Sequence, residues 1–454
     1  MRRAPLILAL LAIAAGLAAL VVFRTREKPT WTTSSPEALQ EFDQALDARM
    51  RLYGDEAAEH FRRALELDPD FVGARVLYAE TVHGKEDRDK VMAPLAGMDL
   101  SDRSDRERFL AQIVELRLSQ AKPAEIKSAI ERFVDEHPRD PWGIFMLAGL
   151  AWEHRDWGRA QELYLRLLEV DPNWVLAHNN LGYLAMAQGR FAESEERFRT
   201  YSFVAPDQAN PHDSLGELLV LLGRYDEARS ELETALAMRP DFCASYNNLL
   251  AIATMTGHSD ELEPVLVRVE RDCAPEMAAE LRCEAAIITA YLDEDFDAIW
   301  REPERFTCLP EGRPRGPLYH RMALLTGRND EANAEEKAWA ERAARAEKNG
   351  YGPGKQEISV VWNHVQGVRR LAEGRPEEAA ANFRSADGSA VFWGLGQGRM
   401  KLYNLLNLAL ALERAGDLDA SKEALAQASA VNPAFTEVAY AGLPERTPGP
   451  RSGS

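Results

Sequence analysis

The chain has 454 residues, of which 46% are hydrophobic and 28% charged, a composition typical of a globular protein rather than a disordered one. Its net charge of −19 argues against nucleic acid as a partner, because nucleic-acid binding requires a basic face that displaces counterions from phosphate. The charge also argues against peripheral binding to anionic lipid. A partner of basic character is allowed, although solubility alone would explain the same charge.

The first predicted element is a membrane anchor. Residues 6–23 form a run without any charged side chain. As a helix this run would be about 27 Å long, close to the thickness of the hydrocarbon core of a bilayer. We therefore expect residues 1–26 to be an uncleaved transmembrane helix in the inner membrane. A cleaved signal peptide is the alternative, because Ala12-Ile13-Ala14 has the small-x-small pattern of a cleavage site.

The flanks of this anchor bear on its orientation. Two arginines precede it and three basic residues follow it, so the positive-inside rule is nearly balanced. Because the N-terminal tail is short, we expect the rest of a single-pass membrane protein to be exported to the periplasm. Residues 27–37 are predicted to be a linker, in which Ser35-Pro36-Glu37 has the pattern of a helix start.

An internal repeat with a constant period of about 34 residues organises most of the remaining chain. Pro172, Pro206 and Pro240 recur at this spacing, and each ends a helix because proline has no N–H to donate. Small residues recur at the same step, where only a small side chain lets two helix axes approach to about 8–10 Å. These small residues are Gly182 and Gly216 in first helices, and Ala160, Ser194 and Ala228 in second helices. Glycines at 189, 223 and 257 are placed to end the first helices in a left-handed conformation.

The period also predicts the domain organisation. Residues 38–276 are expected to form an array of about seven helix pairs, and residues 360–435 two further pairs. Residues 277–359 are expected to be an irregular helical segment, because several prolines interrupt the period there. The glycine-rich stretch 394–401 is expected to be a loop between the last two pairs, and residues 436–454 a disordered tail.

These motifs make the chain resemble tetratricopeptide repeat proteins over about 38–276 and 360–435. The resemblance implies an all-α fold, a right-handed superhelical solenoid of antiparallel helix pairs behind one N-terminal transmembrane helix. More narrowly, residues 32–39 and 207–217 resemble stretches of bacterial receptor-type kinases and transcription regulators, in which a repeat array follows a membrane helix. Only five residues precede the apolar run here, so the resemblance implies a membrane-tethered recognition module without its effector domain.

Four cysteines bear on the compartment: Cys243, Cys273, Cys283 and Cys308. On the repeat register they open or close helices, so all four should lie along one edge of the stack. Disulfides Cys243–Cys273 and Cys283–Cys308 are the simplest pairing, although four cysteines permit three connectivities. Such disulfides would imply an oxidising compartment. The alternative is four buried free thiols that behave as small apolar residues.

The sequence contains no recognisable catalytic, metal-binding or nucleotide-binding motif. No zinc spacing, nucleophile elbow or phosphate loop occurs. The nearest glycine-rich match, residues 394–398, lacks the preceding strand that a nucleotide site requires. We therefore predict no catalytic residues, no metal and no cofactor, and we do not expect an enzyme.

A partner-binding groove is the remaining candidate site. In arrays of this kind one face of each first helix lines the inner wall. The residues predicted on that face are Trp142, Phe145, Trp152, Asn179, Tyr183, Asn210, Asp213, Glu217 and Asn247. An aromatic patch beside amides and acids suits an extended peptide or a helix. The alternative is that these are ordinary packing or solvated positions.

The sequence thus predicts a membrane-anchored scaffold that binds a protein or peptide partner in its groove, for an assembly in the cell envelope. A module that senses a ligand or partner for a separately encoded effector is the alternative. An enzyme built on residues 277–359 is a third hypothesis, disfavoured because no catalytic constellation occurs there. The sequence leaves the oligomeric state and the identity of the partner open.

Overall fold

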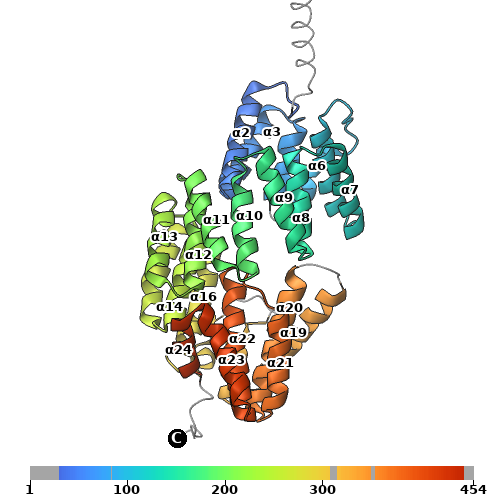
Figure 1. The fold of residues 1–454 in the computed structure, drawn as a ribbon. Helices are drawn as coiled ribbons and strands as arrows, with labels where there is room; N and C mark the ends of the chain where they lie inside the picture. Colours follow the sequence, from blue (N-terminus) through green and yellow to red (C-terminus); the bar gives the residue numbers. More distant parts are fainter. Residues whose placement is uncertain (1–29, 83, 307–313, 349–352, 444–454) are drawn as a thin grey trace, which may run out of the picture. The chain divides into compact units, whose positions relative to one another are not determined.

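The computed structural model describes residues 30–82, 84–306, 314–348 and 353–443 (Figure 1). These residues are helical throughout and contain no strand, which confirms the predicted all-α class for this part of the chain. In the described ranges no helix is both long and apolar enough to cross a membrane. The predicted anchor, residues 1–26, and residues 444–454 of the predicted tail lie outside the described residues. Residues 436–441, the start of that predicted tail, are helical.

The chain divides into two compact units, Met1–Leu147 (unit 1) and Ala148–Ser454 (unit 2), with the division inside α8 (Pro141–Glu153). The helices of unit 1 that precede α8 are α2 (Pro36–Met50), α3 (Gly54–Leu67), α4 (Val72–Thr81), α5 (Lys85–Met92), α6 (Asp105–Leu118) and α7 (Pro123–Glu136).

The regular helices of unit 2 are α9 (Trp157–Val170), α10 (Val175–Ala187), α11 (Phe191–Val204), α12 (Ala209–Leu221), α13 (Tyr225–Met238), α14 (Cys243–Thr256) and α15 (Leu262–Asp272). They are followed by helices of unequal length, α16 (Pro275–Leu292), α17 (Ala298–Arg301), α18 (Pro317–Leu325) and α19 (Asn329–Lys348). The C-terminal helices are α20 (Pro353–Ala372), α21 (Pro376–Ser389), α22 (Gly394–Ala415), α23 (Leu418–Val431) and α24 (Pro433–Ala441).

The predicted helix ends within the repeats are confirmed. Helices α9, α11 and α13 end at Val170, Val204 and Met238, in each case just before the proline of the period. This follows because the residue before a proline is biased away from the helical conformation. Gly223 and Gly257 have φ values of +75° and +78°, as expected for glycines that end a first helix.

The predicted close crossing of the two helices in a pair is also confirmed. A Cβ atom on Gly216 of α12 would lie 2.8 Å from Cγ of Leu232 on α13. Gly182 of α10 meets Phe198 of α11 in the same way. A larger side chain at either glycine would push the helices of its pair apart.

The start of unit 1 is tied to the repeats by one buried carboxylate. Glu107 of α6 is fully buried and accepts hydrogen bonds from the backbone N–H groups of Thr32 (3.1 Å) and Gly73 (3.2 Å). It also completes a capping box with Ser104 at the start of α6. The described part of the predicted linker is therefore packed against the first repeats.

The prediction of a loop at residues 394–401 is wrong, because these residues form the first two turns of α22. Glycine weakens an isolated helix by about 1 kcal/mol relative to alanine. Here the absence of a side chain serves packing, since a Cβ atom on Gly398 would lie 2.7 Å from Leu221 of α12. The close approach of α22 to α12 offsets the poor helix propensity.

The core of unit 2 joins segments that are far apart in the sequence. One continuous apolar cluster includes Leu218 of α12, Ile252 of α14, Phe383 of α21 and Leu406 of α22, all fully buried. The C-terminal helix pairs therefore share a core with the central repeats. They do not form a separate domain.

Candidate partner-binding surface

The predicted groove acids Asp213 and Glu217 lie on α12, but neither faces open solvent. Asp213 is 5% exposed, and its Oδ1 accepts hydrogen bonds from Ser245 Oγ (2.8 Å) and Asn248 Nδ2 (3.1 Å). Burial, followed by the charge of Glu217, raises the pKa of Asp213 to about 7. This carboxyl is part of the interior of unit 2.

Glu217 connects three helices through its two oxygens. Tyr183 of α10 donates to Oε2, and the backbone N–H of Leu395, at the start of α22, donates to Oε1 at 2.6 Å. Burial raises the pKa of the Glu217 carboxyl, and also holds the pKa of the Tyr183 hydroxyl well above its ordinary value. Ser214, one turn earlier on α12, donates to Asn179 Oδ1 at 3.0 Å. The amides and acids form an internal hydrogen-bonded layer.

The segment before α22 runs across the ends of the central helices of unit 2. Trp393 contacts Trp152 edge to face, with ring centroids 5.4 Å apart. Phe392 contacts Phe191 of α11 in the same way at 5.2 Å. The backbone carbonyl of Ser389 accepts a hydrogen bond from Arg155 at 3.1 Å. The chain's own residues therefore contact Trp152, one of the predicted groove residues.

These contacts place several of the predicted groove residues in the interior of unit 2. Asn179, Asn210 and Asp213 are less than 10% exposed, and Asn210 donates to the hydroxyl of Tyr201 at 3.1 Å. Asn247 is exposed, as predicted, but it is the adjacent Asn248 that joins the buried layer. The period places a residue on a helix face correctly, but it does not show what covers that face.

The remaining two predicted groove residues belong to unit 1. Trp142 is 6% exposed, and its ring lies against Trp31 with centroids 5.9 Å apart. The guanidinium of Arg49 lies 5.9 Å from the centre of the same ring. Phe145 is half-buried. In unit 1, Trp142 is a packing residue that holds the linker and α2.

One of the two expected cysteine pairs lies within the described residues. A disulfide joins Cys243, at the start of α14, to Cys273, which caps the end of α15, with Cα atoms 6.0 Å apart. Cys283 is 3% exposed in α16. Cys308 lies outside the described residues, so its pairing with Cys283 stays a prediction.

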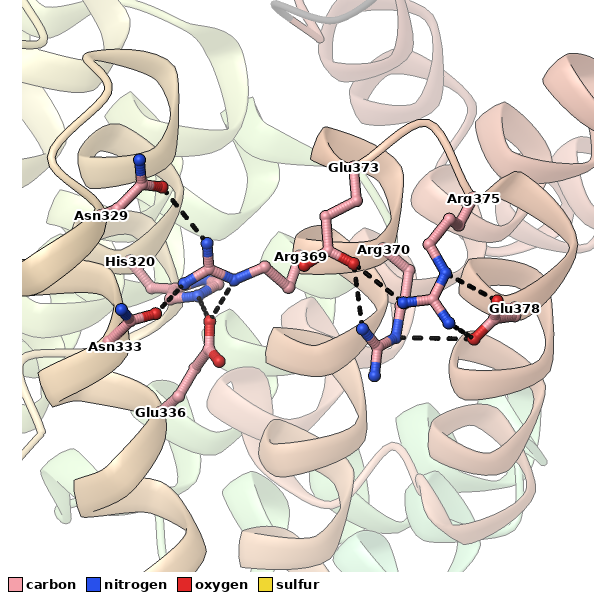
Figure 2. Close-up of polar contacts among 9 residues, drawn as sticks. All are labelled: His320, Asn329, Asn333, Glu336, Arg369, Arg370, Glu373, Arg375 and Glu378. Carbon is pink, nitrogen blue, oxygen red and sulfur yellow. Dashed lines mark hydrogen bonds and ion pairs between the residues drawn. The ribbon is translucent and has the colours of Figure 1, made fainter.

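Residues 314–348 are joined to the C-terminal repeats by a polar layer, shown in Figure 2. Arg369 of α20 donates to Glu336 (2.7 Å) and Asn333 (2.8 Å) of α19. Glu336 also bonds Nε2 of His320, which is fully buried on α18. Among the described residues no group of three or more histidine, cysteine or acidic side chains could hold a metal. The layer links α18, α19 and α20 through these hydrogen bonds.

Unit 1 has a pocket that the sequence analysis missed. It has a volume of about 460 Å³ and lies among α2, α4, α5 and α6. Its lining residues are Arg49, Ala79, Glu80, Arg88, Val114, Arg117, Leu118 and Gln120, which we call the arginine pocket. A sequence signal was available, since Arg49 and Arg117 stand two full repeat periods apart and occupy equivalent positions on α2 and α6.

Comparison with known proteins finds tetratricopeptide repeats in three segments, residues 145–209, 211–242 and 402–435. These matches include most of the regular stretch from which the period was read, so the chain contains tetratricopeptide repeats in these three segments. No curated protein sequence matches it.

Several solved structures are similar to the chain at low identity. PilW, described as a widely conserved type IV pilus biogenesis factor, has a TM-score of 0.34 and 17% identity, covering 43% of this chain and 93% of that one. PilF of Pseudomonas aeruginosa has a TM-score of 0.29 and 15% identity, covering 52% and 91%. Yeast Tom70 has a TM-score of 0.32 and 13% identity, covering 90% and 88%. At such scores none of these structures carries an argument about function.

Proposed function

We propose that this tetratricopeptide-repeat protein is a membrane-anchored scaffold that holds a protein partner for an assembly in the cell envelope. The observation that carries the proposal is the arginine pocket. It is formed mainly by α2, α4 and α6, which are the first helices of three consecutive repeats. Solenoids of this kind bind through surfaces to which successive repeats each contribute side chains.

The choice of surface follows from burial. In unit 2 the equivalent face of α12 is bonded to α22 of the same chain through Glu217 and Leu395. In unit 1 the pocket is open, and the side chain of Arg117 is 49% exposed. Its volume of about 460 Å³ lies within the range of about 300–1,000 Å³ that is usual for binding pockets. The anchor supplies the membrane location, and its support is the apolar run at residues 6–23.

Site-specific photocrosslinking in intact cells tests the scaffold. A benzophenone side chain at Leu118, inside the pocket, is expected to capture a partner protein on irradiation. The control position is Gln112, which is exposed on the same helix but does not line the pocket. Equal capture from both positions, or none from Leu118, would count against a scaffold that binds through this pocket.

A sensing module is the second candidate, and the contact between α12 and α22 favours it. The residues of this contact are 178 positions apart and include a half-buried carboxylate, so a partner that competes for α12 could release α22. Hydrogen exchange of the Leu395 amide checks this, because release would speed its exchange when the captured partner is added. Unchanged exchange would contradict the sensing module and leave the scaffold as the only proposed function.

A further inference from the structure

The arginine pocket has a charge opposite to that of the whole chain. Three guanidinium groups line it, those of Arg49, Arg88 and Arg117, and Glu80 is the only carboxylate among the described residues that line it. The pocket therefore carries two positive charges in excess, in a chain whose net charge is −19. A local potential of the opposite sign has to be built by placing specific side chains, and it attracts ligands of negative charge.

Glu80 holds two of the arginines in place. Its Oε2 lies 2.9 Å from Nη2 of Arg49, and its Oε1 lies 2.8 Å from Nη1 of Arg117. A guanidinium has five N–H donors, and each of these contacts uses only one. The carboxylate thus orients both groups and leaves most of their donors directed elsewhere.

Arg88 completes the pocket from α5. Its Nε donates to the backbone carbonyl of Val82 at 3.2 Å, which fixes the guanidinium without neutralising it. Two of the acids near it in sequence, Glu86 and Asp87, both pair with Lys90 (3.0 and 3.3 Å). Neither of these two acids lines the pocket.

Apolar side chains lie among the charges. Ala79, Val114 and Leu118 contribute carbon surface to the lining. Two cationic groups beside an apolar patch match a peptide in which acidic residues flank an apolar residue. Guanidinium groups bind carboxylates through two parallel hydrogen bonds, which gives orientation as well as affinity.

We propose that the arginine pocket binds an acidic segment of the partner protein, with carboxylates on Arg88 and Arg117 and an apolar side chain against Val114 and Leu118. This inference rests on the proposed scaffold function and adds the chemistry of the partner. It requires side-chain carboxylates and makes no use of a chain terminus.

Peptide binding to the full-length protein in detergent tests the inference. The probe is a short peptide with blocked ends and a neutral fluorophore that carries Glu-Glu-Leu-Glu-Glu. The comparison peptide carries Gln-Gln-Leu-Gln-Gln. We expect the glutamate peptide to bind more tightly and its affinity to fall as salt is raised.

Two matched double variants localise the binding. Arg88→Gln/Arg117→Gln removes two charges from the pocket, and Arg62→Gln/Arg63→Gln removes two exposed charges from α3, outside it. The pocket variant is expected to weaken binding of the glutamate peptide about fivefold or more, and the control variant less than about twofold. Circular dichroism melting of both variants establishes that each is folded.

The outcomes separate the two proposals. Equal binding of the two peptides, equal loss in the two variants, or binding of inorganic phosphate without binding of the glutamate peptide would each overturn the acidic-segment inference. If Leu118 still captures a partner in cells while the pocket variant leaves that capture unchanged, the scaffold stands and the inference fails. If Leu118 captures nothing while the glutamate peptide binds, the scaffold fails and the chemistry of the pocket stands.

Discussion

Among single residues, Asp213 contributes to the pH dependence of the stability of unit 2. Its carboxyl has an ordinary pKa of 3.8 and a folded pKa of about 7, because it is buried beside Glu217. The folded state thus binds the proton more tightly than the unfolded state. The stability that the protonated group contributes is present in full below about pH 3.8 and is lost as the pH rises through about 7.

The substitution Asp213→Asn tests this linkage. The amide keeps an oxygen that accepts from Ser245 and Asn248 but carries no charge. We expect wild-type and variant stability to be similar near pH 4, and the variant to be more stable near pH 8 by on the order of 2–4 kcal/mol in urea unfolding. Asp226→Asn, at an exposed position on α13, is the control and should change little.

A pH profile identical to that of the wild type would contradict the assignment of Asp213. The comparison between variants is needed because His364 acts in the opposite sense. Burial lowers its pKa to about 3, so the stability that it contributes is present above about pH 6.5 and is lost as the pH falls toward 3. Acid unfolding of the wild type therefore reports several groups at once.

Glu107 has the equivalent structural role in unit 1. Removal of its carboxylate by Glu107→Ala leaves the amides of Thr32 and Gly73 without their acceptor inside the protein. We expect a loss of about 3 kcal/mol in the free energy of unfolding, measured by urea denaturation, with faster hydrogen exchange in residues 30–82. Glu115→Ala, at an exposed position on the same helix, should cost less than about 0.5 kcal/mol. Equal losses in the two variants would show that the buried contacts of Glu107 contribute little.

At the scale of helices, Gly396 and Gly398 near the start of α22 form a natural pair for comparison. A Cβ atom at Gly398 would meet Leu221 at 2.7 Å, whereas a Cβ atom at Gly396 would have no neighbour within 4 Å. We expect Gly398→Leu to lower the melting temperature, because overpacking costs about 1–3 kcal/mol. Gly396→Leu should be neutral or stabilising, because leucine favours a helix. The reverse order would mean that α22 does not approach α12 as closely as described.

The helix pairs themselves could be predicted from the sequence because the forces that define them are local. Pro172, Pro206 and Pro240 each end the helix that precedes them, whatever the rest of the fold does. Gly216 allows a close crossing with the helix that directly follows it in the chain. The class of fold and most helix ends depend on such short-range effects. The prediction of a loop at the start of α22 was wrong because a high glycine content usually indicates a loop. Here the absence of a side chain instead allows close packing against α12, a helix that is distant in the sequence.

The candidate site was only partly predictable, for a related reason. Asp213 and Glu217 lie on the expected helix and side by side, but the contact that covers them comes from Leu395. The repeat period describes neighbouring helix pairs and contains no information about a contact between positions so distant in the chain. The arginine pocket was missed because Arg88 has no equivalent in the neighbouring repeats and only Arg49 and Arg117 keep the register.

For the whole molecule, the predicted export of the body to an oxidising compartment can be tested through its cysteines. The four cysteines of the chain, two of them in a described disulfide, make thiol labelling a direct measurement. If the body is exported, alkylation of protein taken from cells and denatured should find no reactive thiol until a reductant is added. Reactive thiols at Cys243 and Cys273 without reductant would contradict an oxidising compartment. A reporter that is active only in the cytoplasm, fused after Ser454, supplies an independent check.

The bond between Leu395 and Glu217 also has a consequence for how the protein is made. During synthesis α12 emerges well before the residues that cover it, so its carboxyls and apolar side chains stay exposed until the rest of the chain follows. Contacts of such long range slow folding and leave aggregation-prone surfaces in the interval. Chains truncated between α15 and α22 should therefore be insoluble or captured by chaperones, although every helix pair that they contain is complete.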